Sequence, residues 1–469
     1  YNYEQRYLIE FNGRYDGSSK FPVNEMWGFF PSASAAWRIS EEKFMEGTRS
    51  WLDNLKLRFS VGTLGNGNVD PYKFLPTMSI DKTGVIVGDG QVNYTSYPGL
   101  IPNNLTWEKV TTYDVGVDVD MFKNRLTIGF DWYRRNTTDM YTVGPTLPEV
   151  LGTTQPKGNY ADLKTKGWEL TLSWRDNFKL AGSDFHYGVK LMLWDSQSWI
   201  TKYNNATGKL SDYYEGYRIG DIWGYNIEGL FTSYDEIANH ADQDYMKISD
   251  SKIWQPGDLK FADLNGDGKI DKGAQTLSDH GDLVIVGNEE ERYHYGFNLN
   301  VGWKGIGISA FFQGVGKRDW YPGQETGFFW GKYNRPYGYS LKMHENRWTE
   351  ENPNPNAYWP RLVGYSSENG GRPMGTPNNR YMQDASYLRL KALTVDYSLP
   401  QAWVSKLGLT GLKIYFTGEN LFTFSNVCEN FDPEVIKGGD VDLKDRKGEE
   451  QGYSYPMLKT YTVGLNVSF

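Results

Sequence analysis

The side chains with the clearest potential for chemistry are oxygen donors that alternate through residues 263–271. The run reads Asp263, Leu264, Asn265, Gly266, Asp267, Gly268, Lys269, Ile270, Asp271. Oxygen side chains at positions 1, 3, 5 and 9 and Gly at position 6 match the start of an EF-hand loop, whose oxygens converge on one calcium ion. We therefore predict a calcium site formed by the side chains of Asp263, Asn265, Asp267 and Asp271 and by the backbone carbonyl of Lys269.

Position 12 of this loop leaves a second interpretation open. Ala274 stands where an EF-hand loop has a bidentate Glu. The absence of this Glu should weaken calcium binding unless the carboxylate of Asp279 or Asp282 folds back onto the loop. The alternative is a turn rich in Asp and Asn that needs no metal. No other cofactor is expected.

Aromatic side chains crowd two long polar segments, near 203–225 and 321–359. Aromatic faces stack on sugar rings, and Asn, Asp and Arg side chains bond hydroxyl groups. As substrate-binding residues we nominate Trp330, Tyr333, Arg335 and Trp359. The same composition also suits packing between loops or contact with a protein lid, and these alternatives remain open.

Catalysis finds little support in the sequence. The acidic run at 289–291 reads as a solvated charge cluster, and sequence cannot show the carboxylate separation that glycoside hydrolysis requires. There is no nucleophile elbow, phosphate-binding loop or zinc spacing. We predict that the protein is not an enzyme.

The elements that would position these loops are alternating strands. In residues 293–303 the odd positions are large and apolar and the even positions are small or polar. This pattern predicts a strand with one apolar face, and eleven residues are enough for a tilted strand to cross a bilayer. A turn at Lys304-Gly305 leads into a second alternating segment, 306–312. A single hairpin of this kind also fits a soluble β-sandwich.

The same alternation recurs along the whole chain and predicts about twelve strands. They lie near residues 9–15, 33–39, 55–61, 113–119, 126–132, 168–174, 187–193, 293–303, 306–312, 388–397, 412–416 and 461–469. A change of phase between Leu390 and Leu393 predicts a β-bulge.

The predicted connections alternate between short and long. Short ones lie near 123–125, 175–184, 304–305 and 399–409, and long ones span about 66–106, 140–165, 202–291, 321–384 and 427–455. A meander with every second connection long has its long loops on one side, as bacterial outer-membrane barrels do. We therefore predict an all-β fold, an antiparallel transmembrane β-barrel portion with long extracellular loops.

Composition agrees with this prediction. Aromatic residues make up 16% of the 469 residues, with 34 Tyr and 17 Trp, which suits aromatic girdles at the two membrane interfaces. No apolar run reaches the length of a transmembrane helix. The formal net charge of −9 and the absence of a basic stripe argue against nucleic acid as a partner. Cys428 is the only cysteine, so no intrachain disulfide forms.

Several motifs, in order, make the whole chain, residues 1–469, resemble the C-terminal part of the barrel of SusC-like TonB-dependent outer-membrane transporters. They are Arg14-Tyr15-Asp16-Gly17-Ser18-Ser19, Phe30-Pro31-Ser32, Ala35-Ala36-Trp37-Arg38, Gly257-Asp258 with 263–268, Tyr295-Gly296-Phe297-Asn298-Leu299, Phe311-Phe312-Gln313-Gly314, Asp384-Ala385-Ser386-Tyr387-Leu388-Arg389-Leu390-Lys391, Gly418-Glu419-Asn420-Leu421-Phe422-Thr423 and Phe431-Asp432-Pro433-Glu434.

The resemblance implies a 22-stranded barrel in the outer membrane of a Gram-negative bacterium, surrounded by outer-membrane lipid and plugged by an N-terminal domain. It also implies energy coupling to the TonB complex through a TonB box, and a SusD-like surface lipoprotein as a lid. We find neither plug nor TonB box in this chain, so we expect the TonB complex to act through a missing N-terminal part.

The expected function is import of oligosaccharides, with peptide import by the same family as the alternative. Two other classes remain open, a secreted glycan-binding β-protein and a glycoside hydrolase on a β scaffold. A requirement for detergent would separate the transporter from both.

Overall fold

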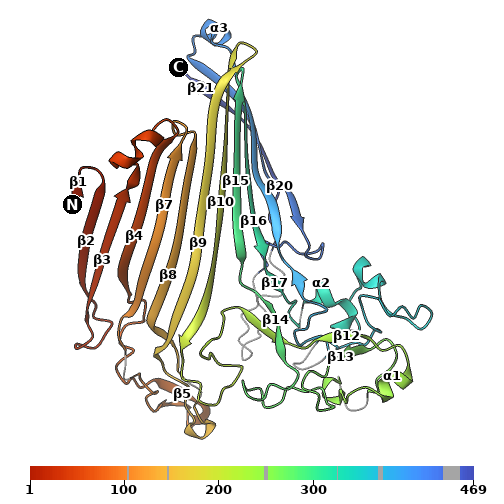
Figure 1. Cartoon of the computed structure of the whole chain (residues 1–469). Helices are drawn as coiled ribbons and strands as arrows, with labels where there is room; N and C mark the ends of the chain where they lie inside the picture. The colour runs from red at the N-terminus through yellow and green to blue at the C-terminus, as the bar shows by residue number, and fades with distance from the viewer. Residues whose placement is uncertain (103–104, 145–146, 248–251, 325, 368–372, 437–454) are drawn as a thin grey trace. The chain divides into compact units, whose positions relative to one another are not determined.

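A computed structural model describes residues 1–102, 105–144, 147–247, 252–324, 326–367, 373–436 and 455–469. Thirteen of the strands that these residues form join in one sheet, and neighbours in the sheet follow one another along the chain apart from strands inserted within connections (Figure 1). In order they are β1 (Asn2–Tyr3), β2 (Tyr7–Gly17), β3 (Trp27–Arg38), β4 (Leu52–Asn66), β7 (Glu108–Met121), β8 (Leu126–Val143), β9 (Lys157–Leu180), β10 (Ser183–Lys202), β15 (Arg292–Trp303), β16 (Ile306–Lys317), β19 (Tyr387–Ser398), β20 (Gly411–Ser425) and β21 (Thr460–Ser468). The predicted antiparallel meander is confirmed, with the two-residue β1 added to the expected twelve strands.

The chain divides into two compact units. The first comprises Tyr1–Thr171 and Ser196–Arg218, and the second comprises Leu172–Asp195 and Ile219–Phe469. The first unit contains most of β1 to β9. The second contains the remaining large strands and the connections that carry the candidate site.

The hairpin from which the strand prediction started forms as expected. Its registers include Phe297 opposite Phe312, Leu299 opposite Ala310 and Val301 opposite Ile308. Lys304 and Gly305 both have positive φ, 50° and 82°, as a two-residue type I′ turn requires. The predicted bulge is also confirmed, because the pairing of β19 with both neighbours skips one residue between Leu390 and Ala392.

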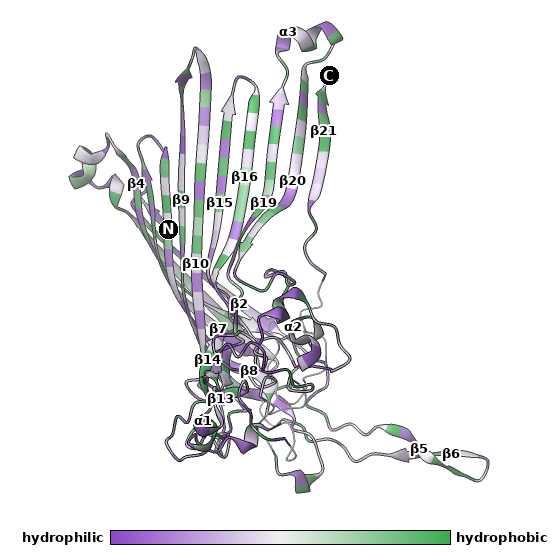
Figure 2. Cartoon of the chain, turned by 90° about the vertical axis from the view of Figure 1, so that its right-hand side faces the viewer, coloured by the Kyte–Doolittle hydropathy of each residue, from purple (hydrophilic) through white to green (hydrophobic). Residues whose placement is uncertain are grey.

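The apolar faces of the large strands are exposed. Phe11 is 78% exposed, Phe29 62% and Val463 75%. Figure 2 shows hydrophobic and hydrophilic residues alternating along β10 and β16. The other sheets of the described residues have two strands each, so none of these could cover such a face. A soluble sandwich would bury these side chains, whereas a membrane barrel turns them toward lipid.

The opposite face of the sheet carries charge. Arg58 on β4 donates from Nε to Asp118 on β7 at 2.9 Å and from Nη2 to Asp131 on β8 at 2.8 Å. These residues lie one position away from outward apolar side chains, as strand alternation requires. This face suits a water-filled lumen.

The short connections are tight. Residues 122–125 and 181–182 join β7 to β8 and β9 to β10, the second more closely than predicted. Residues 399–410 hold α3 (Gln401–Val404) and the 3₁₀ turn η7 (Ser405–Leu407), and residues 39–51 hold η1 (Ile39–Glu41) and η2 (Lys43–Thr48).

The long connections form small elements of their own. These are β5 (Ile80–Val87), β6 (Gly90–Thr95), η3 (Glu149–Leu151), β11 (Asp221–Gly224), β12 (Ile227–Leu230), α1 (Tyr234–Ala238), η4 (Asp244–Met246), β13 (Leu259–Phe261), β14 (Val284–Asn288), β17 (Asp319–Trp320), α2 (Gly327–Trp330), η5 (Gly331–Tyr333), η6 (Lys342–Glu345) and β18 (Gln383–Asp384). The connection predicted at 140–165 is shorter, because β8 runs to Val143 and β9 starts at Lys157. Most of the predicted 427–455 loop lies outside the described residues. None of the helices formed by the described residues has the length and apolar character needed to span a membrane.

We predict that Phe130→Arg lowers the free energy of unfolding by at least about 2 kcal/mol, because it places a charge on the lipid-facing side of β8. Gly129→Arg is the matched control. It lies on the opposite face of the same strand, where a Cβ would meet no atom within 4 Å, and it should change stability by less than about 1 kcal/mol. Urea unfolding of the full-length protein in lipid vesicles measures both. Equal losses would contradict a lipid-facing side for β8.

Candidate functional site

The connection between β16 and β19 folds around a core of aromatic rings. Trp330, Tyr333, Trp359 and Tyr381 are at most 1% exposed. The ring of Trp359 lies 5.3 Å from both Tyr333 and Tyr381, and Trp330 meets it edge-on at 6.1 Å. We call these four residues the aromatic loop core. Its rings hold distant parts of one connection together.

The polar tips of these rings are satisfied by backbone carbonyls. The Nε1 of Trp330 donates to Gly323 at 2.7 Å, and that of Trp359 donates to Met343 at 3.0 Å. The Tyr333 hydroxyl donates to Pro360 at 2.7 Å, and burial raises the pKa of this phenol. Burying a polar group that keeps its hydrogen bond costs little free energy, so these polar tips do not destabilise the packed core.

His344 packs against the aromatic loop core in its neutral form. The backbone N–H of Leu341 donates to Nδ1 at 2.9 Å, so Nε2 carries the proton and donates to the carbonyl of Phe329 at 2.8 Å. Burial lowers the pKa of His344. The ring therefore acts as an uncharged link between two turns of the connection.

Three of the four nominated ligand residues, Trp330, Tyr333 and Trp359, lie inside this core, and Arg335 is half-buried beside it. The structure thus brings them together, but as packing partners. A substrate could stack on these three rings only after the core opened. Their role as substrate contacts stays a prediction, and the packing alternative accounts for their positions.

The predicted calcium loop is a tight turn in which carboxylates accept backbone N–H groups. Asp263 accepts from Gly266 at 2.7 Å and from Gly268 at 2.9 Å, and Asp267 accepts from Lys269 at 2.8 Å. No three His, Cys, Asp or Glu side chains gather as a metal site would require within the part of the chain described. Calcium binding here stays a prediction, and an ion would have to draw these oxygens away from the backbone.

Asp282 folds back onto this loop. It is fully buried, and its carboxylate accepts from the backbone N–H of Leu264 at 2.8 Å and of Asp271 at 2.9 Å. Asp279 accepts instead from Ala274 at 3.1 Å. Of the two residues considered as replacements for the missing twelfth ligand, Asp282 is therefore the one that spans the loop.

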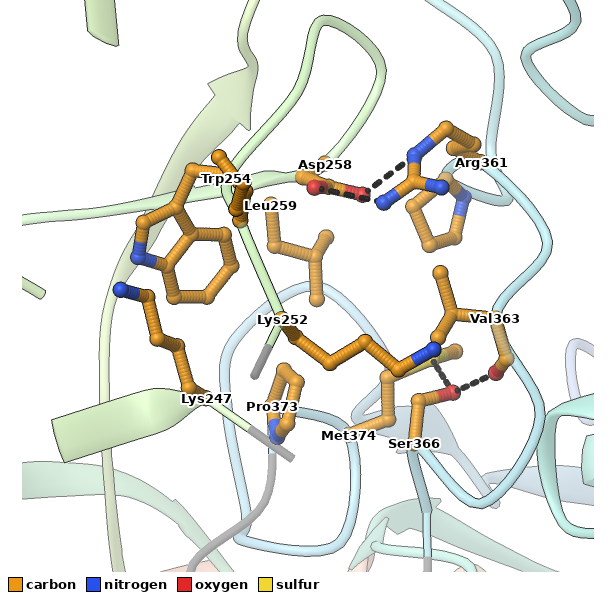
Figure 3. A pocket seen from close by; sticks show the side chains of 12 residues that line it. Lys247, Lys252, Trp254, Asp258, Leu259, Arg361, Val363, Ser366, Pro373 and Met374 are labelled. Atoms are coloured by element: carbon orange, nitrogen blue, oxygen red, sulfur yellow. Dashed lines mark hydrogen bonds and ion pairs between the residues drawn. The ribbon is translucent and has the colours of Figure 1, made fainter. Parts of the chain in front are cut away.

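A pocket that sequence reasoning did not find lies where two distant segments meet (Figure 3). The indole of Trp254 and the ammonium group of Lys247 line one side, and Val363 and Met374 bring apolar surface from the other. The Lys252 side chain extends across the pocket toward Ser366. No sequence motif joins the two segments, which are about a hundred residues apart. Their contact follows only from the folded connections.

One ion pair sets the geometry of this pocket. Arg361 donates from Nε and Nη2 to the two oxygens of Asp258, each at 3.0 Å, the bidentate arrangement that fixes two groups most firmly. Burial raises the pKa of Asp258, and the Arg361 guanidinium opposes this. The backbone N–H of Arg361 also donates to the carbonyl of Gly257 at 2.7 Å. The pair therefore holds the two segments at a fixed spacing.

A second charge cluster ties the last connection to β19. Arg389 is 3% exposed and donates to Asp432 at 2.6 Å, to Glu434 and to Thr423 at 2.8 Å. Lys391, two residues along the same face, bonds Glu434 at 2.7 Å. This cluster joins two motifs that lie far apart in sequence, around residues 389 and 432.

Comparison with known proteins identifies relatives along the full chain. The profile of the TonB dependent receptor-like, beta-barrel family matches residues 1–268. Identity is 29% to TonB-dependent receptor P3 and 30% to TonB-dependent receptor P26, both from Formosa agariphila, and 27% to TonB-dependent receptor SusC from Bacteroides thetaiotaomicron. Each alignment covers 100% of this chain and 44%, 45% and 43% of the respective relative. The chain thus spans less than half the length of these relatives.

Solved structures share the fold. The structure of the RagAB peptide transporter aligns over 100% of this chain and 46% of its own chain, with a TM-score of 0.73 and 22% identity. The RagAB peptide importer in the "open-open" state aligns with a TM-score of 0.74 at the same identity, over 45% of its chain.

We predict that Arg389→Gln destabilises the protein by about 3 kcal/mol, because it leaves Asp432 and Glu434 without their buried cation. Lys413→Gln is the control. It breaks the more exposed Lys413–Asp396 pair at 3.0 Å, which should contribute less than about 1 kcal/mol. Limited proteolysis of the full-length protein reports on the connection after β20. Unchanged protease resistance of Arg389→Gln would contradict an anchoring role.

Proposed function

The chain belongs to the TonB dependent receptor-like β-barrel family of outer-membrane transporters, and from this premise we propose that it forms barrel wall and outer loops of an oligosaccharide importer. The observation that carries this proposal is the two-sided sheet, apolar outward and charged inward, with its long connections folded into an ordered region. Such a sheet separates lipid from an aqueous passage. We place the importer in the outer membrane of a Gram-negative bacterium, the location of its family.

The partners belong to the same proposal. A SusD-like surface lipoprotein would close over the long connections, and the TonB complex would supply energy through parts of the transporter outside this chain. In this scheme no residue is catalytic. The loops bind and release cargo.

The proposal also concerns the chemical class of the cargo, oligosaccharide or peptide. Trp254 offers a ring face for a sugar. Lys247 is paired with Asp244 at 2.6 Å, so Lys252, across the pocket, is the cation that suits a hydroxyl or acidic substituent. The apolar surface from Val363 and Met374 suits instead an aliphatic side chain of a peptide, the alternative cargo. RagAB is a peptide transporter, but a likeness at 22% identity concerns the fold alone. We favour oligosaccharide because the half-buried indole of Trp254 is the feature of this pocket with a sugar-specific use.

We predict that Trp254→Ala in the full-length protein weakens binding of the cognate oligosaccharide about tenfold, the loss of roughly 1.4 kcal/mol of stacking. Trp403→Ala, on the short α3 at a short connection and 60% exposed, should leave binding unchanged. Cells that carry each variant are tested for uptake of labelled oligosaccharides and, separately, labelled peptides.

Three outcomes would count against the proposal. Uptake of peptides alone selects the alternative cargo. Uptake that persists in cells without the TonB complex would exclude energy coupling through that complex. A full-length protein that stays monodisperse without detergent removes the membrane assignment itself.

We further propose that the 263–271 loop binds calcium weakly. The Asp282 carboxylate would hold the loop in place through its hydrogen bonds to the backbone of Leu264 and Asp271. Calcium at millimolar concentration should raise the unfolding temperature of the full-length protein, with a dissociation constant on the order of 0.1–1 mM. Asp263→Asn with Asp267→Asn should abolish the shift, and Glu350→Gln, an exposed acid of another loop, should keep it. No bound ion at several millimolar calcium in titration calorimetry would leave the metal-free turn as the correct interpretation.

A further inference from the structure

The outward faces of β7, β8 and β9 share a gradation along their length. Toward the ends that lead into long connections, aliphatic side chains give way to aromatic ones and then to cations. On β7 the order is Val117, Val115, Tyr113, Thr111, Lys109; on β8 it is Ile128, Phe130, Trp132, Arg134; on β9 it is Leu170, Trp168, Lys166, Lys164. The register of β7 with β8 places Val115 opposite Trp132 and Tyr113 opposite Arg134, so the bands of the two strands follow the same order and are offset by one residue pair.

An open depression lies at the cationic end of β9 and β10. Lys164 and Lys166 line it together with Trp199, Thr201 and the backbone turn at Gly216. The hydroxyls of Thr165 and Ser198 lie 2.8 Å apart, which fixes the pairing and puts Lys164 across from Trp199. Its ammonium lies 5.8 Å from the Trp199 ring centroid, a cation–π contact.

The wall of the depression is held by backbone bonds. The N–H of Ile200 donates to Tyr217 and that of Gly216 donates to Ile200, both at 2.9 Å. Glu215, exposed on the same turn, brings a carboxylate to the rim. The depression is thus a formed feature of the first unit.

The three cations nearest the aromatic band, Arg134, Lys164 and Lys166, have no carboxylate partner. None of them forms an ion pair with any residue in the described ranges. Arg134 donates from Nε to the neutral Asn136 at 3.1 Å. Cations next to an apolar band are costly unless they reach an anion or water at the interface. Phosphate groups of lipid headgroups supply that anion.

We propose that this surface, made by Arg134, Lys164, Lys166 and Trp199, binds the phosphorylated glycolipid of the outer leaflet. The long connections of a bacterial barrel face the cell exterior, so the cationic band meets the headgroups of that leaflet; this step rests on the orientation in the proposed function. The lysines and Arg134 pair with phosphates, and the Trp199 ring packs against the lipid sugar. The aromatic band below lies at the boundary with the acyl chains.

The test uses full-length protein in nanodiscs and native mass spectrometry with diphosphorylated lipid A and its dephosphorylated form as probes. Arg134→Gln, Lys164→Gln and Lys166→Gln together should weaken binding of diphosphorylated lipid A at least about tenfold and leave the dephosphorylated form unaffected. Arg135→Gln with Lys190→Gln, on the opposite face of β8 and β10, is the control with unchanged binding. Native affinity for diphosphorylated lipid A in the double variant Lys164→Arg with Lys166→Arg would show that the positive charge of these side chains binds the phosphate.

Equal binding of both lipid forms by the native protein, or full binding by the triple variant, would overturn the proposal. Displacement of the lipid by millimolar inorganic phosphate would show an unspecific anion site and overturn it as well. If the triple variant does not fold, Lys166→Gln alone, at an exposed position, gives the same comparison with a smaller loss. Cargo uptake is measured separately, so failure here leaves the transport proposal standing.

Discussion

The structure depends on one constraint, that hydrocarbon offers no hydrogen bonds to the backbone and no solvation to charge. A closed ladder of strands satisfies the backbone, and strict alternation keeps charge on the other face. The second consequence is visible in neighbouring residues of β8, where Phe130 points outward and Asp131 bonds Arg58. Every other feature of the chain is arranged around this sheet.

The two ends of the sheet are used differently. Short connections such as 181–182 and 304–305 do little more than reverse the chain, whereas the long ones build packed structure with rings, ion pairs and small strands. The Asp258–Arg361 and Arg389–Asp432 pairs each join segments distant in sequence. Loops of this length would otherwise lose much entropy on ordering, and buried rings and paired charges offset that loss.

Sequence predicted the sheet well because alternation is a local signal with a physical cause. The strands, the 304–305 turn and the bulge near Leu390 all follow from period and turn chemistry. The site was predicted poorly because contacts inside long connections leave no period. Trp330 and Trp359 carry the chemistry of a sugar site, yet nothing in their spacing shows that they pack on each other. The Trp254 pocket needs Arg361, about a hundred residues away, and only folding reveals that pair.

Close packing of the aromatic loop core also limits how this region can move. Trp330, Trp359 and Tyr381 share contacts, and each polar tip has one backbone partner, so displacing one ring leaves the others with voids and unmet hydrogen bonds. Packed cores of this kind rearrange as units rather than by continuous deformation. Under the proposed function, opening of the loops for cargo would therefore move the connection between β16 and β19 as one body. Its fixed points are then the ends where it joins the two strands.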